Sequence, residues 1–382
     1  MEQSIDTILI VLFLTALAIP VYSYFVFPMI LRTIVRFKEI DYQQNESYEP
    51  SVTLIISAYN EEAVIAAKLE NSKNLDYPSE KLQIIVINDG STDRTDEIIE
   101  SYKASGILHH RVEGRQGKNE AINKTWPLIE GEIVVFSDAN SIYRKDAIRQ
   151  LVSHYADQRI GCVCGELTYI DVEAGTASGE GLYWEYEQFL KRLQSRIGDI
   201  LVLNGSIFAL RHELFQQLHP KIANDFQVPI NIAEQNYAIV YEPKAIAVEK
   251  AAGSAKDELG RKARIIARGY EGFFHYLPKL RGIRLFQFIS MKFLRWNVWL
   301  AMLAMIISNT LLLDYRLFQY AFIAQLLFYS LAVVGPVLNR LKIPGIILPY
   351  YFCMINLGAI IGLWRFVTRK QKASWEPPNS AR

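Results

Sequence analysis

Hydrophobic residues gather at the two ends of the chain. Residues 8–31 are apolar apart from one threonine, one serine and two tyrosines. That stretch is long enough to cross a hydrocarbon core of about 30 Å. Three further apolar runs lie near the other end, at about residues 297–313, 317–338 and 345–364. Residues 285–296 are also apolar but contain Lys292 and Arg295, which favours an interfacial helix over a span.

The hydropathy pattern therefore predicts five segments. They are an N-terminal transmembrane helix (1–38), a central domain of ordinary polar composition (39–280), an interfacial helix (281–296), a region of two to three spans (297–368) and a tail (369–382).

Basic residues beside the first apolar stretch indicate its orientation. Arg32, Arg36 and Lys38 follow it, and no basic residue precedes it. Cytoplasmic flanks of spans are enriched in Lys and Arg, so we expect a multi-pass cell-membrane protein with its central domain in the cytoplasm. Two acidic residues at the amino end, and the length of the stretch, disfavour a cleavable signal peptide.

The carboxyl-terminal spans leave two alternatives. Three full spans after a cytoplasmic domain put the carboxyl end outside. Four basic residues after the last apolar run favour the inside: Arg365, Arg369, Lys370 and Lys372. Either one run does not cross the membrane fully, or the tail departs from the charge rule.

Short β-branched runs alternate with helical patterns in the central domain. Residues 51–57, 82–88 and 132–137 are typical of buried strands. Helical patterns cover residues 62–73, 93–104 and about 118–129. Strands separated by helices predict right-handed βαβ units and a mostly parallel, Rossmann-like α/β sheet.

Polar residues follow each of these strands. The segments are Ala58-Tyr-Asn-Glu61, Asp89-Gly-Ser-Thr-Asp93 and Asp138-Ala-Asn140. Each segment alone is an ordinary helix cap or turn. Because the carboxyl ends of parallel strands share one edge, which is where open α/β sheets bind ligands, the three together predict a ligand site.

Two common nucleotide motifs are absent from the sequence. No G-x-G-x-x-G follows the first strand and no G-x-x-x-x-G-K-[ST] occurs, which disfavours a dinucleotide site and a P-loop. Residues 114–118 instead combine two glycines with Arg115 and Lys118. A flexible backbone with two cations suits phosphate oxygens, although alone it is typical of a solvated turn.

Composition narrows the functional classes. The 382 residues carry 41 Lys and Arg against 40 Asp and Glu, and this net charge of +1 disfavours a nucleic-acid binder. A hydrophobic content of 51% excludes a disordered chain, and a mean hydropathy of +0.08 fits a mixture of membrane and soluble parts. We expect Cys162, Cys164 and Cys353 to be reduced structural thiols, and no Cys/His metal pattern occurs.

Four motifs in order carry a resemblance to a known family. They are S-A-Y-N-E-E (57–62), N-D-G-S-T-D-R-T (88–95), G-K-N-E-A-I-N (117–123) and S-D-A-N (137–140). Residues 50–275 resemble family 2 glycosyltransferases with the GT-A fold, and in particular membrane-embedded synthases of hyaluronan, poly-N-acetylglucosamine and cellulose. The flanking apolar runs share only the layout of those synthases.

The resemblance implies a site for a nucleotide sugar, with UDP as the expected nucleotide. The implied donor-binding residues are Tyr59, Asn60, Glu61, Asp89 and Lys118. Asp138 and Asn140 stand where the family has a D-x-D metal motif, so Mg²⁺ or Mn²⁺ is the expected cofactor. Asn140 replaces the usual second acid and is a weaker, neutral oxygen ligand, so another residue could assist Asp138.

The second half of the domain resembles the acceptor side of these enzymes. Asn204 and Gly205 belong to the acceptor segment, and Asp225 stands at the position of the general base. A carboxylate with a raised pKa can take the proton of an attacking hydroxyl. Direct attack opposite the leaving group would invert the anomeric carbon, as in single-displacement hydrolases.

Three arginines precede the second apolar region. Arg261, Arg264 and Arg268 occupy the place of the family's Q-x-x-R-W, with Arg261 for Gln and Ile265 for Trp. The resemblance implies that Arg264 and its neighbours clamp the diphosphate; the alternative is a basic helix against anionic lipid headgroups. Trp184 is a candidate platform for the acceptor sugar, although an aromatic at helical spacing is more often core.

The predicted function is an inverting hexosyl- or N-acetylhexosaminyltransferase in cell-envelope polysaccharide synthesis. The expected partners are a nucleotide-sugar donor, a glycan or polyprenyl-linked acceptor and the bilayer. The alternative is a non-catalytic membrane scaffold that binds a nucleotide or glycan, which the departures at Asn140 and Ile265 favour. The sugar, the linkage, processivity and the oligomeric state stay open.

Overall fold

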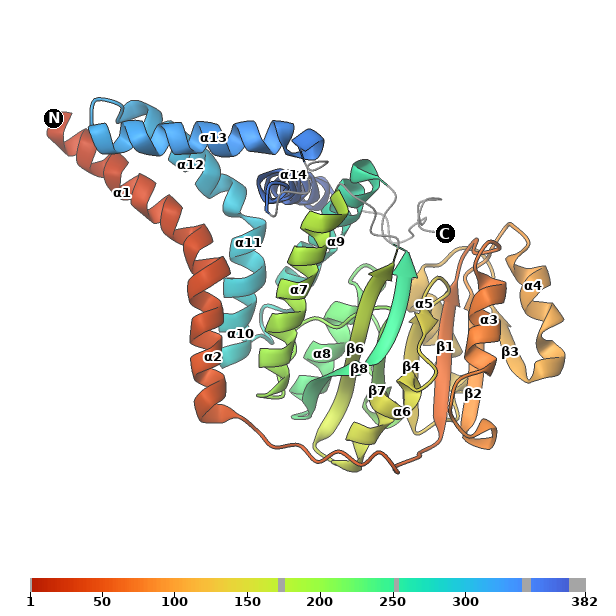
Figure 1. The fold of residues 1–382 in the computed structure, drawn as a ribbon. Coiled ribbons are helices and arrows are strands. Elements are labelled where there is room, and N and C mark those ends of the chain that lie inside the picture. The colour runs from red at the N-terminus through yellow and green to blue at the C-terminus, as the bar shows by residue number, and fades with distance from the viewer. Residues whose placement is uncertain (1, 171–175, 251–253, 339–344, 371–382) are drawn as a thin grey trace.

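The hydrophobic runs of the central region pair into one eight-stranded mixed sheet (Figure 1). The computed structural model describes residues 2–170, 176–250, 254–338 and 345–370. The strand order is β3-β2-β1-β4-β7-β6-β8-β5. The strands are β1 (Val52–Ala58), β2 (Leu82–Asn88), β3 (Ile107–Arg111), β4 (Ile133–Asp138), β5 (Ile142–Tyr143), β6 (Ile160–Ile170), β7 (Ile207–Arg211) and β8 (Ala238–Lys250).

The three predicted strands are confirmed as β1, β2 and β4, which lie within one residue of the expected bounds. β1 pairs in parallel with β2 and with β4, and β2 pairs in parallel with β3. β7 pairs antiparallel with β4 and β6, so the sheet changes direction in its middle. The carboxyl ends of β1, β2 and β4 therefore meet at one edge, as the α/β pattern predicts.

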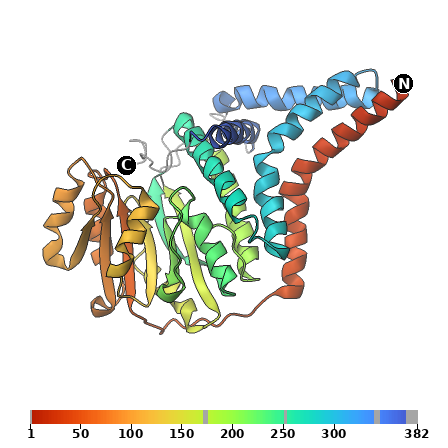
Figure 2. The same cartoon turned by 180° about the vertical axis from the view of Figure 1, so that it is seen from behind.

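Helices cover both faces of the sheet (Figures 1 and 2). On one face, Leu54 of β1 packs in the same cluster as residues of α3, α4 and α6. On the other face, Ile55 packs with residues of α5 and α8. The helices of the domain are α3 (Ile65–Lys73), α4 (Thr95–Ser101), α5 (Lys118–Thr125), α6 (Ala147–Val152), α7 (Thr176–Ser195), α8 (Asn224–Glu234) and α9 (Ala255–Tyr276).

A third apolar cluster joins the domain to the flanking helices. Phe27 and Leu31 of α2 (Phe27–Lys38) pack there with Leu190 of α7, Phe226 of α8 and Phe273 of α9. Helix α10 (Gly282–Phe288) also belongs to this cluster. Segments from both ends of the chain thus pack on the same side of the domain, as both ribbon views show.

The apolar ends form helices long enough to cross a membrane. α1 (Glu2–Val21), the π-helix η1 (Tyr22–Val26) and α2 make one candidate span, Gln3–Lys38. Two others are α13 (Arg316–Leu338) and α14 (Leu348–Val367). The predicted interfacial run forms α10, the π-helix η7 (Ile289–Phe293) and α11 (Leu294–Trp296), and a bend of 56° separates it from α12 (Val298–Leu311). The described residues thus hold three candidate spans, or four if this bent pair is one span; most of the tail lies outside them.

Small residues let α14 lie directly on α9. An added Cβ on Gly362 would lie 2.8 Å from the carbonyl oxygen of Ala263 and 3.1 Å from the Cβ of Ile266. One on Gly358 would lie 3.2 Å from the Cβ of Lys262. Close backbone approach through spaced glycines is a common way to pack helices in membranes. Here it joins a candidate span to the helix that carries the three arginines.

We predict that Gly362→Ala destabilises the protein by about 1–3 kcal/mol, because the new methyl overlaps the α9 backbone. The matched control is Gly260→Ala on α9, where an added Cβ meets no atom within 4 Å. Alanine favours the helix there by up to about 1 kcal/mol. Thermal unfolding of the full chain in detergent measures the stability of both variants. Equal midpoints for the two variants would contradict the packing argument.

Candidate active site

The loops after β1 and β2 interlock at the carboxyl edge of the sheet. The Asn60 backbone N–H donates to Ser91 Oγ at 2.9 Å, and the Asn60 side-chain oxygen accepts from the Thr92 N–H at 2.8 Å. Asn60 has a positive φ of 52°, a conformation that asparagine tolerates. The N–H of buried Glu61 donates to Thr95 Oγ1 at 2.8 Å. These bonds give the first predicted motif a fixed shape.

Asp89 holds the glycine loop that precedes α5. Its two carboxylate oxygens accept from the backbone N–H groups of Gln116 and Gly117, each at 2.8 Å. Burial raises the pKa of Asp89, while these two bonds oppose the rise. Gly90 lets the two loops touch, since a Cβ there would lie 2.6 Å from the Gly114 carbonyl oxygen. Asp89 thus orders the loop at residues 114–117, and its contact with uridine stays a prediction.

An arginine from the same loop covers the first motif. The guanidinium of Arg115 lies 3.9 Å from the ring centroid of Tyr59, which is a cation–π distance. The predicted donor-binding residues Tyr59, Asn60, Glu61 and Asp89 are therefore brought together by two loops and the 114–118 segment. Lys118, at the start of α5, extends the group toward β4.

The end of β4 collects charges of both signs. Lys118 forms an ion pair with the Asp138 carboxylate, and Ser206 Oγ lies 3.5 Å from Asp138 Oδ2. Glu249 of β8 lies nearby and accepts a hydrogen bond from the Ser141 hydroxyl. Burial and the charge of Asp138 raise the pKa of Glu249. Sequence reasoning missed Glu249, because only the pairing of β8 with β5 and β6 brings it to this edge.

A fully buried lysine, Lys68, supports the loop that follows β4. Lys68 of α3 donates to the Ser141 carbonyl oxygen at 2.6 Å, and its ammonium lies 3.9 Å from the ring centroid of Tyr143. Burial lowers its pKa to about 7, although Asp138 and Glu249 oppose this shift. No sequence signal marks it, since lysines on surface helices are usually solvated.

Asp225 lies on the first turn of α8, against Gly205. A Cβ added to Gly205 would be 3.6 Å from Asp225 Oδ2, which is an ordinary van der Waals contact, so the two residues are close neighbours. Burial raises the pKa of Asp225, and Asp138 raises it further, while nearby cations lower it: Lys118, Arg268 and Lys191. A net upward shift is what a general base requires. The predicted residues Lys118, Asp138 and Arg268 therefore share one electrostatic site with Asp225.

Two asparagines frame Asp225. Buried Asn204 donates to the Gly165 carbonyl oxygen at 2.6 Å and accepts from Lys191 Nζ, so it fixes the loop rather than facing solvent. Buried Asn224 accepts from the Asp225 N–H at 3.0 Å, and its amide nitrogen has no hydrogen-bond partner within the described ranges. A polar ligand group beside Asp225 would satisfy that donor.

The three arginines lie along α9. Arg261 donates to Glu258 at 2.6 Å and to the Tyr169 hydroxyl at 2.9 Å, and its charge lowers the pKa of Glu249. Burial and repulsion from Arg268 and Arg261 lower the pKa of Arg264 to about 9, against the pull of Asp225 and Asp138. Burial also lowers the pKa of Arg268, which Asp225 opposes. Arg264 and Arg268 thus interact with Asp225, whereas Arg261 acts on Glu249 and pairs with Glu258 on α9.

Trp184 is packed as part of the fold. Its indole N–H donates to the Leu167 carbonyl oxygen at 2.6 Å, and its ring meets Tyr169 edge-on at 5.4 Å. Lys191 lies 5.5 Å from its ring centroid, so Trp184 borders the Asn204 loop. A sugar-stacking role for it stays a prediction.

The residues at the end of β4 fit a divalent cation only in part. Among the described residues, no three acidic, histidine or cysteine side chains lie together as a metal site. Asp138 offers one carboxylate, which Lys118 contacts, and half-buried Asn140 offers an amide oxygen. Mg²⁺ and its analogues are commonly held by one or two carboxylates plus substrate phosphates. This oxygen set fits such an ion once a diphosphate is bound.

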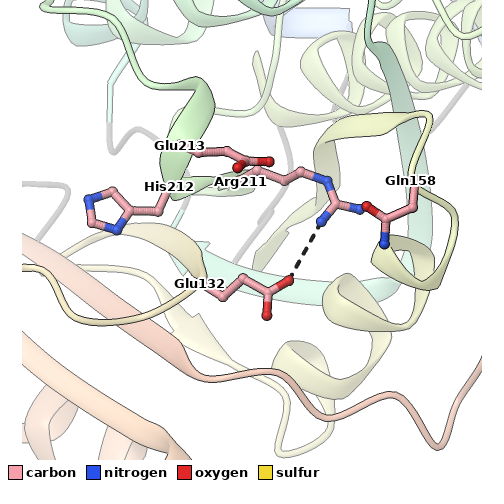
Figure 3. Close-up of a pocket in the computed structure, with 5 residues that line it drawn as sticks. All are labelled: Glu132, Gln158, Arg211, His212 and Glu213. Carbon is pink, nitrogen blue, oxygen red and sulfur yellow. Dashed lines mark ion pairs between the residues drawn. The ribbon is translucent and has the colours of Figure 1, made fainter.

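A surface pocket lies at the opposite edge of the sheet (Figure 3). It has a volume of about 510 Å³ and is lined by Glu132, Gln158, Arg211, His212 and Glu213. Buried Arg211 donates to the carbonyl oxygens of Ile160 and Tyr155 and pairs with Glu132 at 3.6 Å. The Arg211 guanidinium is thus engaged in holding strands and loops together. The pocket contains none of the predicted site residues.

Comparison with known proteins identifies the domain. Residues 53–218 match the sequence profile of Glycosyl transferase family 2. A Bacillus subtilis protein described as a probable glycosyltransferase, YdaM, is 28% identical over 222 residues, which are 55% of this chain and 53% of that protein. This chain therefore spans about half the length of that relative.

Two further similarities cover more of the chain. The poly-beta-1,6-N-acetyl-D-glucosamine synthase of Staphylococcus epidermidis is 24% identical over 294 residues, 73% of this chain and 70% of that protein. The structure of the mannosyltransferase PcManGT from Pyrobaculum calidifontis, in complex with GDP-Man and Mn²⁺, matches with a TM-score of 0.70 and 21% identity. The match covers 94% of this chain and 99% of that one, which confirms the GT-A fold.

We predict that Lys68→Met removes a pH dependence of stability. Lys68 binds its proton less tightly in the folded protein than in the unfolded chain, whose lysines titrate near the ordinary value of 10.5. The free energy of unfolding of wild type should therefore rise from pH 7 toward pH 9, relative to that of the variant, by up to about 1.4 kcal/mol per pH unit. Thermal unfolding of the full chain measures it. Lys73→Met, at an exposed position of α3, is the control and should leave the rise intact; a flat difference between wild type and Lys68→Met would contradict the assignment.

Proposed function

Because residues 53–218 form a family 2 glycosyltransferase domain, we propose that the protein moves a sugar from a nucleotide sugar to a hydroxyl-bearing acceptor, with inversion at the anomeric carbon. The donor is a UDP- or GDP-sugar, and UDP is the nucleotide that the motifs favour. The domain works at the cytoplasmic face of the membrane, in agreement with the basic residues after the first span.

One observation carries this proposal. Asp225 is a half-buried carboxylate with a raised pKa, and Lys118, Arg268 and Asp138 all act on it. A carboxylate in such a setting suits proton removal, and cations beside it suit a diphosphate. The site thus combines a base with anion-binding groups, as transfer from a nucleotide sugar requires.

The reaction follows from these positions. An acceptor hydroxyl gives its proton to Asp225 as its oxygen attacks the anomeric carbon. The bond between that carbon and the diphosphate oxygen breaks, and the electron pair leaves with the nucleoside diphosphate. Attack opposite the leaving group inverts the anomeric centre.

Anionic charge on the leaving group is met by the chain's own cations. Arg264 and Arg268 of α9 and Lys118 of α5 are the residues we assign to the diphosphate. Asp138 and Asn140 would hold a divalent ion, which neutralises phosphate charge when bound. Asp89 positions the backbone of the 114–117 loop near the nucleotide.

The acceptor chemistry separates two forms of the proposal. If the acceptor is a growing polysaccharide, purified enzyme gives a ladder of products. If it is a lipid that receives a single sugar, the enzyme gives one product. Absence of turnover with every UDP- and GDP-sugar would instead favour a non-catalytic scaffold.

We predict that Asp225→Asn lowers transfer by about 10²–10⁴-fold and keeps nucleotide binding. The amide cannot accept the proton, while its shape is unchanged. In wild type, activity should fall as the pH drops through the raised pKa of Asp225, so the acid limb lies above the ordinary aspartate range. Nucleotide release and calorimetric UDP binding are the two measurements. Asp314→Asn, at an exposed position, is the control, and full activity in Asp225→Asn would overturn the assignment of the base.

We predict that Asn140→Asp lowers the Mn²⁺ concentration for half-maximal activity by roughly tenfold, because a carboxylate is a stronger ligand than an amide for a hard cation. Titration of Mn²⁺ in the transfer assay measures the change. Asn74→Asp adds the same charge at an exposed turn and should leave the titration unaltered. An Asn140→Asp curve that overlays wild type would remove Asn140 from the metal site.

A further inference from the structure

A buried group of charged and aromatic side chains lies where α7 meets the candidate membrane helices. Glu187 of α7 pairs with Lys292 of η7 at 2.8 Å and with Arg295 of α11. Tyrosine rings surround the Arg295 guanidinium, with centroids at 5.4, 5.9 and 5.5 Å: Tyr24, Tyr183 and Tyr186. Tyr24 belongs to the first candidate span, and Arg295 to the bent helix pair. We call this group the Arg295 cluster.

The Arg295 cluster continues onto α9 and α14 through Tyr183. Lys262 of α9 lies 4.5 Å from the Tyr183 ring centroid and 5.9 Å from that of Tyr351 on α14. Lys262 also pairs with buried Glu258 at 3.4 Å, and the Tyr351 hydroxyl lies 3.3 Å from the same carboxylate. Helices α7, α9, α11 and α14 thus contribute side chains to one group, and Figure 1 shows α9 and α14 near the upper part of α7.

Among the described residues, two cations, Lys292 and Arg295, pair with one carboxylate, that of Glu187. Lys292, Arg295 and Lys191 all act on Glu187 and hold its pKa far below the usual range, although burial opposes them. Burying charge without compensation is costly, and the carboxylate of Glu187 balances only one of its two paired cations. An anion beside Arg295 would balance the described charges of the cluster.

Arg295 offers a donor for that anion. Its side chain is almost fully buried, with 6% of the residue's surface exposed. Its Nε donates to the Met291 carbonyl oxygen and its Nη2 to Glu187. Its Nη1 is buried and has no hydrogen-bond partner in the described parts of the chain. Arginine commonly binds phosphate through paired N–H donors.

One face of α7 links the Arg295 cluster to the catalytic carboxylate. Tyr183, Glu187 and Lys191 are spaced by four residues and so lie on the same side of the helix. Lys191 donates to Asn204 and is one of the cations that act on Asp225. The cluster and Asp225 are therefore two ends of one polar face.

We propose that the Arg295 cluster binds the phosphate of a lipid acceptor, whose hydroxyl-bearing head reaches Asp225 along α7 while its apolar chains lie against the candidate spans. This assignment rests on the proposed transferase function and names its acceptor as an anionic phospholipid. A neutral hydroxyl lipid would leave the cationic excess uncompensated. Tyrosines that flank the site suit a membrane–water boundary, where their rings are partly apolar and their hydroxyls polar.

The test compares two lipids that share acyl chains and free hydroxyls but differ in phosphate. Full-length protein in neutral detergent is mixed with equal amounts of dioleoyl phosphatidylglycerol and dioleoylglycerol, and the lipids retained after purification are measured. Wild type should retain the phospholipid about tenfold over the neutral lipid, equivalent to about 1.4 kcal/mol. Arg295→Gln should bring the ratio near one. Arg316→Gln removes an exposed arginine at the start of a candidate span and should keep the wild-type ratio.

Three results would overturn the proposal: no preference in wild type, a preference that survives Arg295→Gln, or displacement of the phospholipid by millimolar inorganic phosphate, which would indicate a free-phosphate site. Nucleotide release from a donor sugar is measured in parallel on wild type. Retention of the phospholipid over the neutral lipid, without any nucleotide release, would contradict the transferase function but not the phosphate site. Release with transfer to dioleoylglycerol as efficient as to phosphatidylglycerol would sink the acceptor assignment alone.

Discussion

The balance of charge around Asp225 is the constraint on which the site depends. Asp138 is a like charge near Asp225 in a poorly solvated region, and it raises the pKa of Asp225. Cations from separate elements oppose that rise: Lys118 from α5, Lys191 from α7 and Arg268 from α9. The balance of charge at Asp225 therefore depends on how these helices pack at the sheet edge.

Helix α9 couples this balance to the membrane end of the chain. Its arginines face Asp225 and Asp138, while Gly362 of α14 lies against its backbone at Ala263. A second contact fixes its middle, since a Cβ on Gly269 would lie 2.5 Å from the Trp296 ring. A shift of the α14 or α11 helix would thus move the arginines that we assign to the diphosphate. The apolar ends therefore act on the geometry of the proposed site.

The sequence was informative wherever chemistry follows a strand directly. β1, β2 and β4 were predictable because buried parallel strands are continuous apolar runs, and the motifs after them share an edge by topology alone. Glu249 could not be predicted, because its position depends on the pairing of β8, far away in sequence. Lys68 was equally hidden, since nothing local distinguishes a buried lysine from a solvated one. Trp184 is the opposite case, because the sequence offers it as a sugar platform. In the structure its indole N–H donates to the Leu167 carbonyl oxygen, as expected of a packed residue.

Arg261 shows how the fold divides a sequence motif into separate tasks. It stands seven residues before Arg268 in the same basic run, yet it pairs with Glu258 and contacts Tyr169. Those contacts hold the start of α9 against β6, beside the Tyr351 hydroxyl that also reaches Glu258. The next two arginines are then directed toward the carboxylates. Consecutive turns of α9 therefore carry both the arginines of the proposed donor site and the contacts with the candidate spans.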